Sequence, residues 1–174
     1  MKDGEFLVIY FSRANENYSV GTVEVGNTEL LAKEIIAKTG ADEFKIVPKV
    51  AYPANYQETV DQATKERNEQ TRPEYVGNVD ISDYDTIFFG YPIWWGDMPM
   101  VVYNFIEKHD WNGKIVIPFN THEGSGNSGT YEILKNKMTG ATLKGDGFNM
   151  SGSVARSDDG IKKLDDWLED LFRV

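Results

Sequence analysis

The sequence contains no cysteine. This absence excludes disulfides, cysteine nucleophiles, thiolate metal sites and iron–sulfur clusters. Any redox function would therefore need a bound cofactor. Histidine is also scarce: only His109 and His122 are present, and they do not stand at a metal-binding spacing. We therefore expect no metal site.

Positive charge is in short supply as well. Eighteen lysines and arginines face 28 acidic side chains, which gives a formal net charge of −10. This balance opposes binding to nucleic acid or to an anionic membrane. Moreover, no apolar run reaches the roughly 18 residues of a membrane-spanning helix, and Met1–Glu5 carries acids where a signal peptide would be basic. We expect a cytoplasmic protein that binds neither nucleic acid nor membrane.

Strand and helix patterns alternate five times along the chain. Such alternation predicts a parallel sheet with helices on both faces, because parallel neighbours need long, right-handed crossovers. At 174 residues the chain fits one domain, so we expect a single three-layer, doubly wound α/β domain over residues 1–174. The expected strands are 6–11, 43–47, 86–89, 114–119 and, weakly, 141–150, and the expected helices are 29–39, 55–70, 99–106, 131–138 and 158–172.

Three loops follow three apolar strands and would converge at the carboxyl edge of such a sheet. The first offers Ser12, Gly26, Asn27 and Thr28 at the start of a helix. Free N–H groups and the helix dipole favour a phosphate there, although a plain helix cap would use the same residue types. Residues 21–28 also approach a nucleoside-triphosphate loop but lack its lysine.

The second loop carries two adjacent tryptophans, Trp94 and Trp95, between Gly90 and Pro99. Glycine and proline are expected to stop the strand at Phe89, so the indoles would stand where a strand leads into a helix. A turn of this kind suits a flat aromatic ligand. The alternative is that one tryptophan belongs to the core and the other lies on the surface by chance.

The third loop contains Gly124–Gly129, which matches G-x-G-x-x-G. A lone match to this dinucleotide fingerprint is weak, and only one strand and one helix follow it. Flexible backbone that approaches a ligand closely is the simpler interpretation. His122 precedes these glycines and is a candidate ligand contact.

Four segments together resemble the flavodoxin family. They are Tyr10-Phe11-Ser12-Arg13, Gly26-Asn27-Thr28, Tyr91-Pro92-Ile93-Trp94-Trp95-Gly96 and the stretch from Pro118 to Gly126. The resemblance runs over essentially the whole chain. It implies a five-stranded parallel sheet in the order 2-1-3-4-5 that binds flavin mononucleotide (FMN) noncovalently at its carboxyl edge.

The resemblance also implies which residues hold FMN. Trp94 falls at the position that stacks on the flavin ring. The phosphate loop would comprise Ser12, Arg13, Gly26, Asn27 and Thr28; the ring would meet Pro92, Ile93, Trp94, Trp95 and Gly96; and its pyrimidine side would meet Thr121, His122, Glu123, Gly124 and Gly126. The chain departs from the family pattern at Asn15–Val25, an insertion that we expect to cover the flavin or a partner site.

The implied function is one-electron transfer, with no catalytic residue of the protein's own. Expected partners are flavin reductase or ferredoxin-type donors and acceptor enzymes. Two alternatives stay open: an FMN-dependent NAD(P)H:quinone or acceptor oxidoreductase on the same fold, and a flavin-free interaction module.

Overall fold

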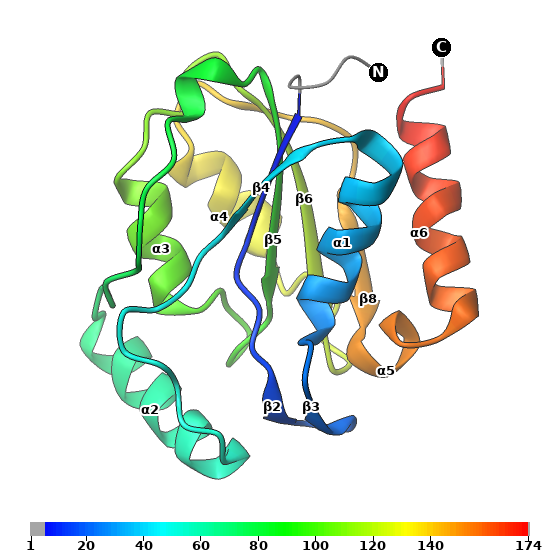
Figure 1. Cartoon of the computed structure of the whole chain (residues 1–174). Coiled ribbons are helices and arrows are strands. Elements are labelled where there is room, and N and C mark those ends of the chain that lie inside the picture. The colour runs from blue at the N-terminus through cyan, green and yellow to red at the C-terminus, as the bar shows by residue number, and fades with distance from the viewer. Residues whose placement is uncertain (1–5, 174) are drawn as a thin grey trace.

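The computed structural model describes residues 6–173 and shows a parallel sheet between two layers of helices (Figure 1). The strand order is β4-β1-β5-β6-β7, and β8 also pairs with β6. In chain order this is the predicted 2-1-3-4-5, with the fifth strand divided in two, so the predicted fold class is confirmed. The strands of this sheet are β1 (Phe6–Tyr10), β4 (Asp42–Lys45), β5 (Thr86–Pro92), β6 (Ile115–His122), β7 (Thr142–Leu143) and β8 (Phe148–Ser151).

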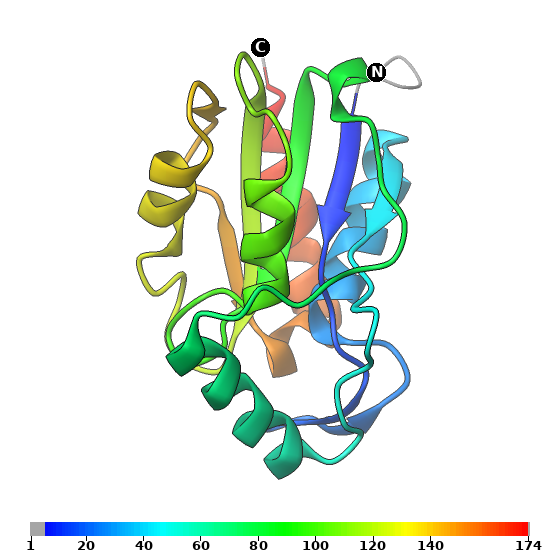
Figure 2. The same cartoon turned by 90° about the vertical axis from the view of Figure 1, so that its left-hand side faces the viewer.

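The helices divide between the two faces of the sheet (Figures 1 and 2). One face is covered by α1 (Asn27–Thr39), α5 (Gly152–Ala155) and α6 (Asp158–Leu171), and the other by α3 (Met100–Glu107) and α4 (Thr130–Lys137). Helix α2 (Tyr56–Glu69) lies next to α3, beyond the carboxyl end of the sheet (Figure 2). The central strand β1 supplies both cores: Leu7 and Ile9 point to the α3 side, whereas Val8 and Tyr10 point to the α1 side. This burial on both faces explains its continuous apolar sequence.

Two central strands are longer than predicted. Strand β5 does not stop at Phe89 but continues through Gly90 to Pro92, and β6 runs on to His122. The prediction that glycine ends the strand is wrong, because Gly90 has a packing role: a Cβ at this position would overlap the Phe119 ring of the neighbouring strand. The extra residues lie at the carboxyl ends of both strands.

Pro118 lies inside β6, although proline lacks the N–H that a central strand normally donates. Strand β6 pairs with β7 at Ile115 and Val116, and with β8 from Phe119 onward. Pro118 faces the interval between these two short strands, where the chain bends away through Gly145 and Gly147, both with positive φ. The missing N–H therefore costs no ladder bond.

The segment between β1 and α1 is more ordered than expected. It forms an antiparallel hairpin of β2 (Asn15–Asn17) and β3 (Gly21–Val23) within the predicted insertion. The hairpin lies beside the first turn of α2 at the carboxyl end of the sheet, at the bottom of Figure 1.

A 3₁₀ turn at Ile81–Asp83 completes the elements. None of the helices within residues 6–173 has both the length and the hydrophobicity of a membrane crossing.

Gly90→Ala tests the packing role assigned to this glycine. The added methyl group would overlap Phe119, so we expect a loss of about 2–3 kcal/mol in the free energy of unfolding, measured by urea denaturation. Gly113→Ala is the control, because a Cβ there meets no atom within 4 Å and its cost comes only from φ of +76°. A loss no greater than that of the control would contradict the assignment.

Candidate functional site

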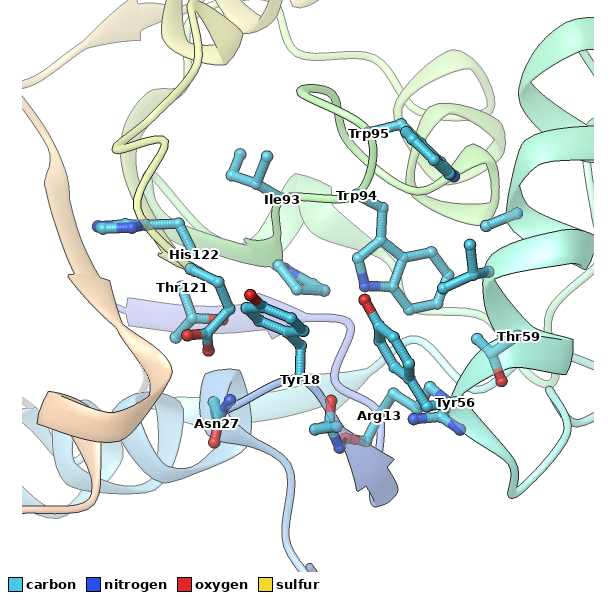
Figure 3. Close-up of a pocket in the computed structure, with 15 residues that line it drawn as sticks. Arg13, Tyr18, Asn27, Tyr56, Thr59, Ile93, Trp94, Trp95, Thr121 and His122 are labelled. Carbon is cyan, nitrogen blue, oxygen red and sulfur yellow. Dashed lines mark hydrogen bonds between the residues drawn. The ribbon is translucent and has the colours of Figure 1, made fainter. Parts of the chain in front are cut away.

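A cavity of about 250 Å³ opens at the carboxyl edge of the sheet (Figure 3). All three predicted loops reach it, so the convergence expected from the sequence is present. Of the predicted site residues, the cavity is lined by Arg13, Asn27, Pro92, Ile93, Trp94, Trp95, Thr121, His122 and Glu123. The predicted site residues that do not line the cavity are Ser12, Gly26, Thr28, Gly96, Gly124 and Gly126.

The first turn of α1 is open toward a ligand. Gly26 is the N-cap and provides no side-chain cap; instead Ser12 Oγ accepts the N–H of Glu29 at 3.0 Å. The N–H of Leu30 bonds the Gly26 carbonyl. Within the described residues this leaves the N–H groups of Asn27 and Thr28 for a ligand or for water. Asn27 and Thr28 are therefore helical residues rather than caps.

A glycine is required at position 26 because α1 starts directly against the end of β1. A Cβ on Gly26 would overlap Ser12 Oγ and the Arg13 carbonyl. The hydroxyl of Thr28 is buried and lies 2.8 Å from the hydroxyl of Thr121 at the end of β6. This bond joins the first loop to the third, so the helix N-terminus is held at the sheet edge.

Arg13 lines the cavity, but the two terminal nitrogens of its guanidinium are already engaged, whereas its buried Nε has no partner among the described residues. Nη2 donates to the carbonyls of Pro53 and Ala54 at 2.7 and 3.0 Å, and Nη1 donates to the Glu16 carbonyl. Burial lowers the pKa of Arg13. A contact between Arg13 and a phosphate stays a prediction; the role that the structure shows is to tie the hairpin to the start of α2.

The two tryptophans occupy different environments. Trp94 and Asp97 exchange two backbone hydrogen bonds, 2.8 and 3.1 Å long, across a turn with positive φ at Trp95 and Gly96. The Trp94 indole is half-buried and nearly perpendicular to Phe11 and Tyr52, with ring centroids 5.3 and 5.0 Å apart. Trp95, in contrast, is 52% exposed. Trp94 is thus a fixed wall, whereas Trp95 stands at the rim.

The third loop presents a neutral imidazole. His122 Nδ1 accepts the N–H of Gly124 at 2.9 Å, which places its proton on Nε2, and burial lowers the pKa of the ring. Beside it, burial raises the pKa of Glu123, although hydrogen bonds from Ser19 and from the Gly152 N–H oppose that change.

Part of the cavity wall was not predicted. Tyr18 and Tyr56 stand in the middle of Figure 3, with ring centroids 6.0 Å apart. Tyr56, Val60 and Ala63 stand at helical spacing on one side of α2, and all three border the cavity. The unpredicted lining residues are Asn17, Tyr18, Tyr56, Thr59, Val60 and Ala63.

The two ends of the cavity have different chemistry. Asn27 and the first turn of α1 lie at one end, and the aromatic wall of Trp94 lies across from them (Figure 3). This arrangement suits a ligand with an anionic group and a flat aromatic group. Within residues 6–173, no three histidine, aspartate or glutamate side chains gather in a way that could hold a metal ion.

Comparisons with known proteins agree on one family. A family model described as Flavodoxin matches residues 6–171. A Bacteroides eggerthii protein provisionally described as a flavoprotein is 28% identical, with 98% of this chain and 99% of that chain covered and a TM-score of 0.74. A similarly described Bacteroides uniformis protein is 26% identical, with 97% and 99% covered and a TM-score of 0.75.

The fold also resembles that of a Lactobacillus acidophilus flavoprotein solved in complex with FMN. It is 18% identical, with 95% of this chain and 99% of that chain covered and a TM-score of 0.63. At this identity the likeness concerns the fold. Among curated proteins, no significant match was found.

Arg13→Met tests the tie between the hairpin and α2. Removing the guanidinium leaves the carbonyls of Pro53 and Ala54 without their donor, so we expect the free energy of unfolding to fall by about 1–2 kcal/mol. Hydrogen exchange at residues 15–23 should become faster. The matched control is Arg67→Met on the exposed surface of α2, which should change neither quantity appreciably. If hydrogen exchange at residues 15–23 did not change, the hydrogen bonds of Arg13 would not be what holds the hairpin.

Proposed function

The chain belongs to the flavodoxin family, and we propose that it binds FMN noncovalently at the carboxyl edge of its sheet and carries single electrons between redox partners. One observation carries this proposal: a single cavity joins the open first turn of α1 to the aromatic wall of Trp94. When bound, FMN would supply the one-electron chemistry that the side chains of a cysteine-free protein lack.

The phosphate would bind at the first turn of α1. The N–H groups of Asn27 and Thr28, the Asn27 side chain and the positive end of the helix dipole all favour an anion there. Ser12 and Thr28 act indirectly, since their hydroxyls hold the helix start in place. No cationic side chain is required for this mode of binding.

The flavin ring would meet Trp94 and the loop at Thr121–Glu123. Because Phe11 and Tyr52 pack perpendicular to the Trp94 indole, the stacking surface is fixed before the ligand arrives. His122 is neutral and lines the cavity beside Thr121 and Glu123. Tyr18 of the hairpin and Tyr56 of α2 enclose the cavity and would limit the access of water to the ligand.

The charge of the protein supports a carrier with separate partners. A net charge of −10 opposes a second negative charge in the site and so favours one-electron transfer. The same charge favours partners with neutral or basic docking surfaces. We therefore propose flavin reductase or ferredoxin-type donors and acceptor enzymes as partners.

The alternative is an FMN-dependent oxidoreductase that takes hydride from NADH or NADPH and reduces a quinone or another acceptor. Such an enzyme needs open space over the flavin. The hairpin reduces that space: Tyr18 reaches the cavity, and the hairpin backbone is fixed to α2 by Arg13 and by the bond from the Tyr56 N–H to Glu16. This geometry favours the carrier.

Trp94→Ala tests the proposed stacking surface. Removing an aromatic partner from a stacked ring costs roughly 1–3 kcal/mol, so we expect the Kd for FMN to rise about tenfold to a hundredfold. Trp95→Ala is the control and should change the Kd less than about threefold, since Trp95 is 52% exposed at the rim. The measurement is FMN fluorescence quenching together with the visible spectrum. A protein that stays colourless with FMN would overturn the proposal in favour of a flavin-free module.

Steady-state oxidation of NADPH and NADH separates carrier from enzyme. The purified holoprotein alone should oxidise NADPH and NADH slowly. Adding a flavodoxin reductase should accelerate the reduction of the holoprotein. Rapid turnover with a quinone in the absence of any partner protein would instead identify an oxidoreductase.

A further inference from the structure

The C-terminal part of the chain contributes an arginine to the phosphate end of the site. Arg156 follows α5, and its Nε donates to Asn27 Oδ1 at 2.8 Å. A second donor of the same guanidinium, Nη2, bonds the carbonyl of Val25. Arg156 thus contacts both the residue before the helix cap Gly26 and the residue after it.

These bonds determine which way the Asn27 amide faces. A guanidinium has donors and no acceptor, so the atom that faces Arg156 Nε must be the amide oxygen. The amide nitrogen and its two N–H groups are then directed away from Arg156. Without this partner, the amide would be free to turn over and present its oxygen, which repels an anion.

Gly152 confines the same amide from the other side. A Cβ on Gly152 would overlap both Asn27 Nδ2 and Glu123 Oε1. The start of α5 therefore approaches Asn27 as closely as backbone allows. Asn27 itself lines the edge of the cavity (Figure 3).

We propose that Arg156 is a positioning residue for the ligand's phosphate: it holds the Asn27 side chain with its N–H groups available to the anion and fixes the Val25 carbonyl where the chain enters α1. This inference rests on the proposed binding of FMN. It assigns the C-terminal segment a part in recognising the phosphate, in addition to the loop between β1 and α1. Glu123 is the acidic side chain that faces the same corner, which makes correct orientation of the amide more important.

The hydrogen-bond geometry of Arg156, rather than its charge, is the feature to test. Arg156→Met removes both, whereas Arg156→Lys keeps the charge but cannot reproduce the planar pair of donors to Asn27 and Val25. Lys108→Met removes one positive charge at the far end of α3 and serves as the control for net charge. Arg156 is exposed, so the variants should fold normally.

The experiment compares two probes, FMN and riboflavin, which differ only in the phosphate. For Arg156→Met and Arg156→Lys, we expect the Kd for FMN to rise about tenfold, as for the loss of a charge-assisted hydrogen bond, while the Kd for riboflavin changes less than about twofold. Lys108→Met should alter neither. In an Asn27→Ala background, Arg156→Met should have little further effect on the ratio of the two Kd values, because the interaction passes through Asn27.

Two results would overturn the inference while leaving FMN binding intact. One is an unchanged ratio of FMN to riboflavin Kd in both Arg156 variants. The other is a full additional loss from Arg156→Met in the Asn27→Ala background, which would mean that Arg156 acts independently of Asn27. A wild-type protein that binds neither probe would overturn the proposed function itself, and this inference with it.

Discussion

The close approach of α1 to the end of β1 is the constraint on which the site depends. Gly26 has no side chain because Ser12 and the Arg13 carbonyl occupy the space where one would stand. Ser12 can therefore cap Glu29 from outside the helix, which leaves the first two N–H groups of α1 open at the sheet edge. Thr28 then reaches Thr121, so one contact also sets the distance between the first and third loops.

Around this fixed centre the chain adds walls from distant segments. The hairpin and α2 are joined through Arg13 and Glu16, and together they supply Tyr18 and Tyr56. On the other side, the start of α5 reaches Asn27 and Glu123. The loops of the sheet edge thus provide the floor of the cavity, the insertion and α2 supply part of its wall, and α5 packs against Asn27 and Glu123.

Local periodicity and the geometry of parallel sheets allowed the alternating α/β architecture and the three converging loops to be predicted from the sequence. The strand order was implied by the resemblance to the flavodoxin family. The roles of Gly90 and Pro118 were not predictable in this way, since each depends on a neighbouring strand: the Phe119 ring in one case and the divided fifth strand in the other. Arg156 was missed because its partner Asn27 lies 129 residues away and the helix that presents it is only four residues long.

The division of the fifth strand also bears on how the protein behaves at high concentration. A long, flat outer strand offers unpaired N–H and C=O groups on which another chain can extend the sheet. Here β7 has two residues and β8 has four, with a bend at Gly145 and Gly147 between them. The opposite border, β4, is four residues long, and three of its side chains, Asp42, Glu43 and Lys45, are charged. Both borders of the sheet are thus poor templates for aggregation.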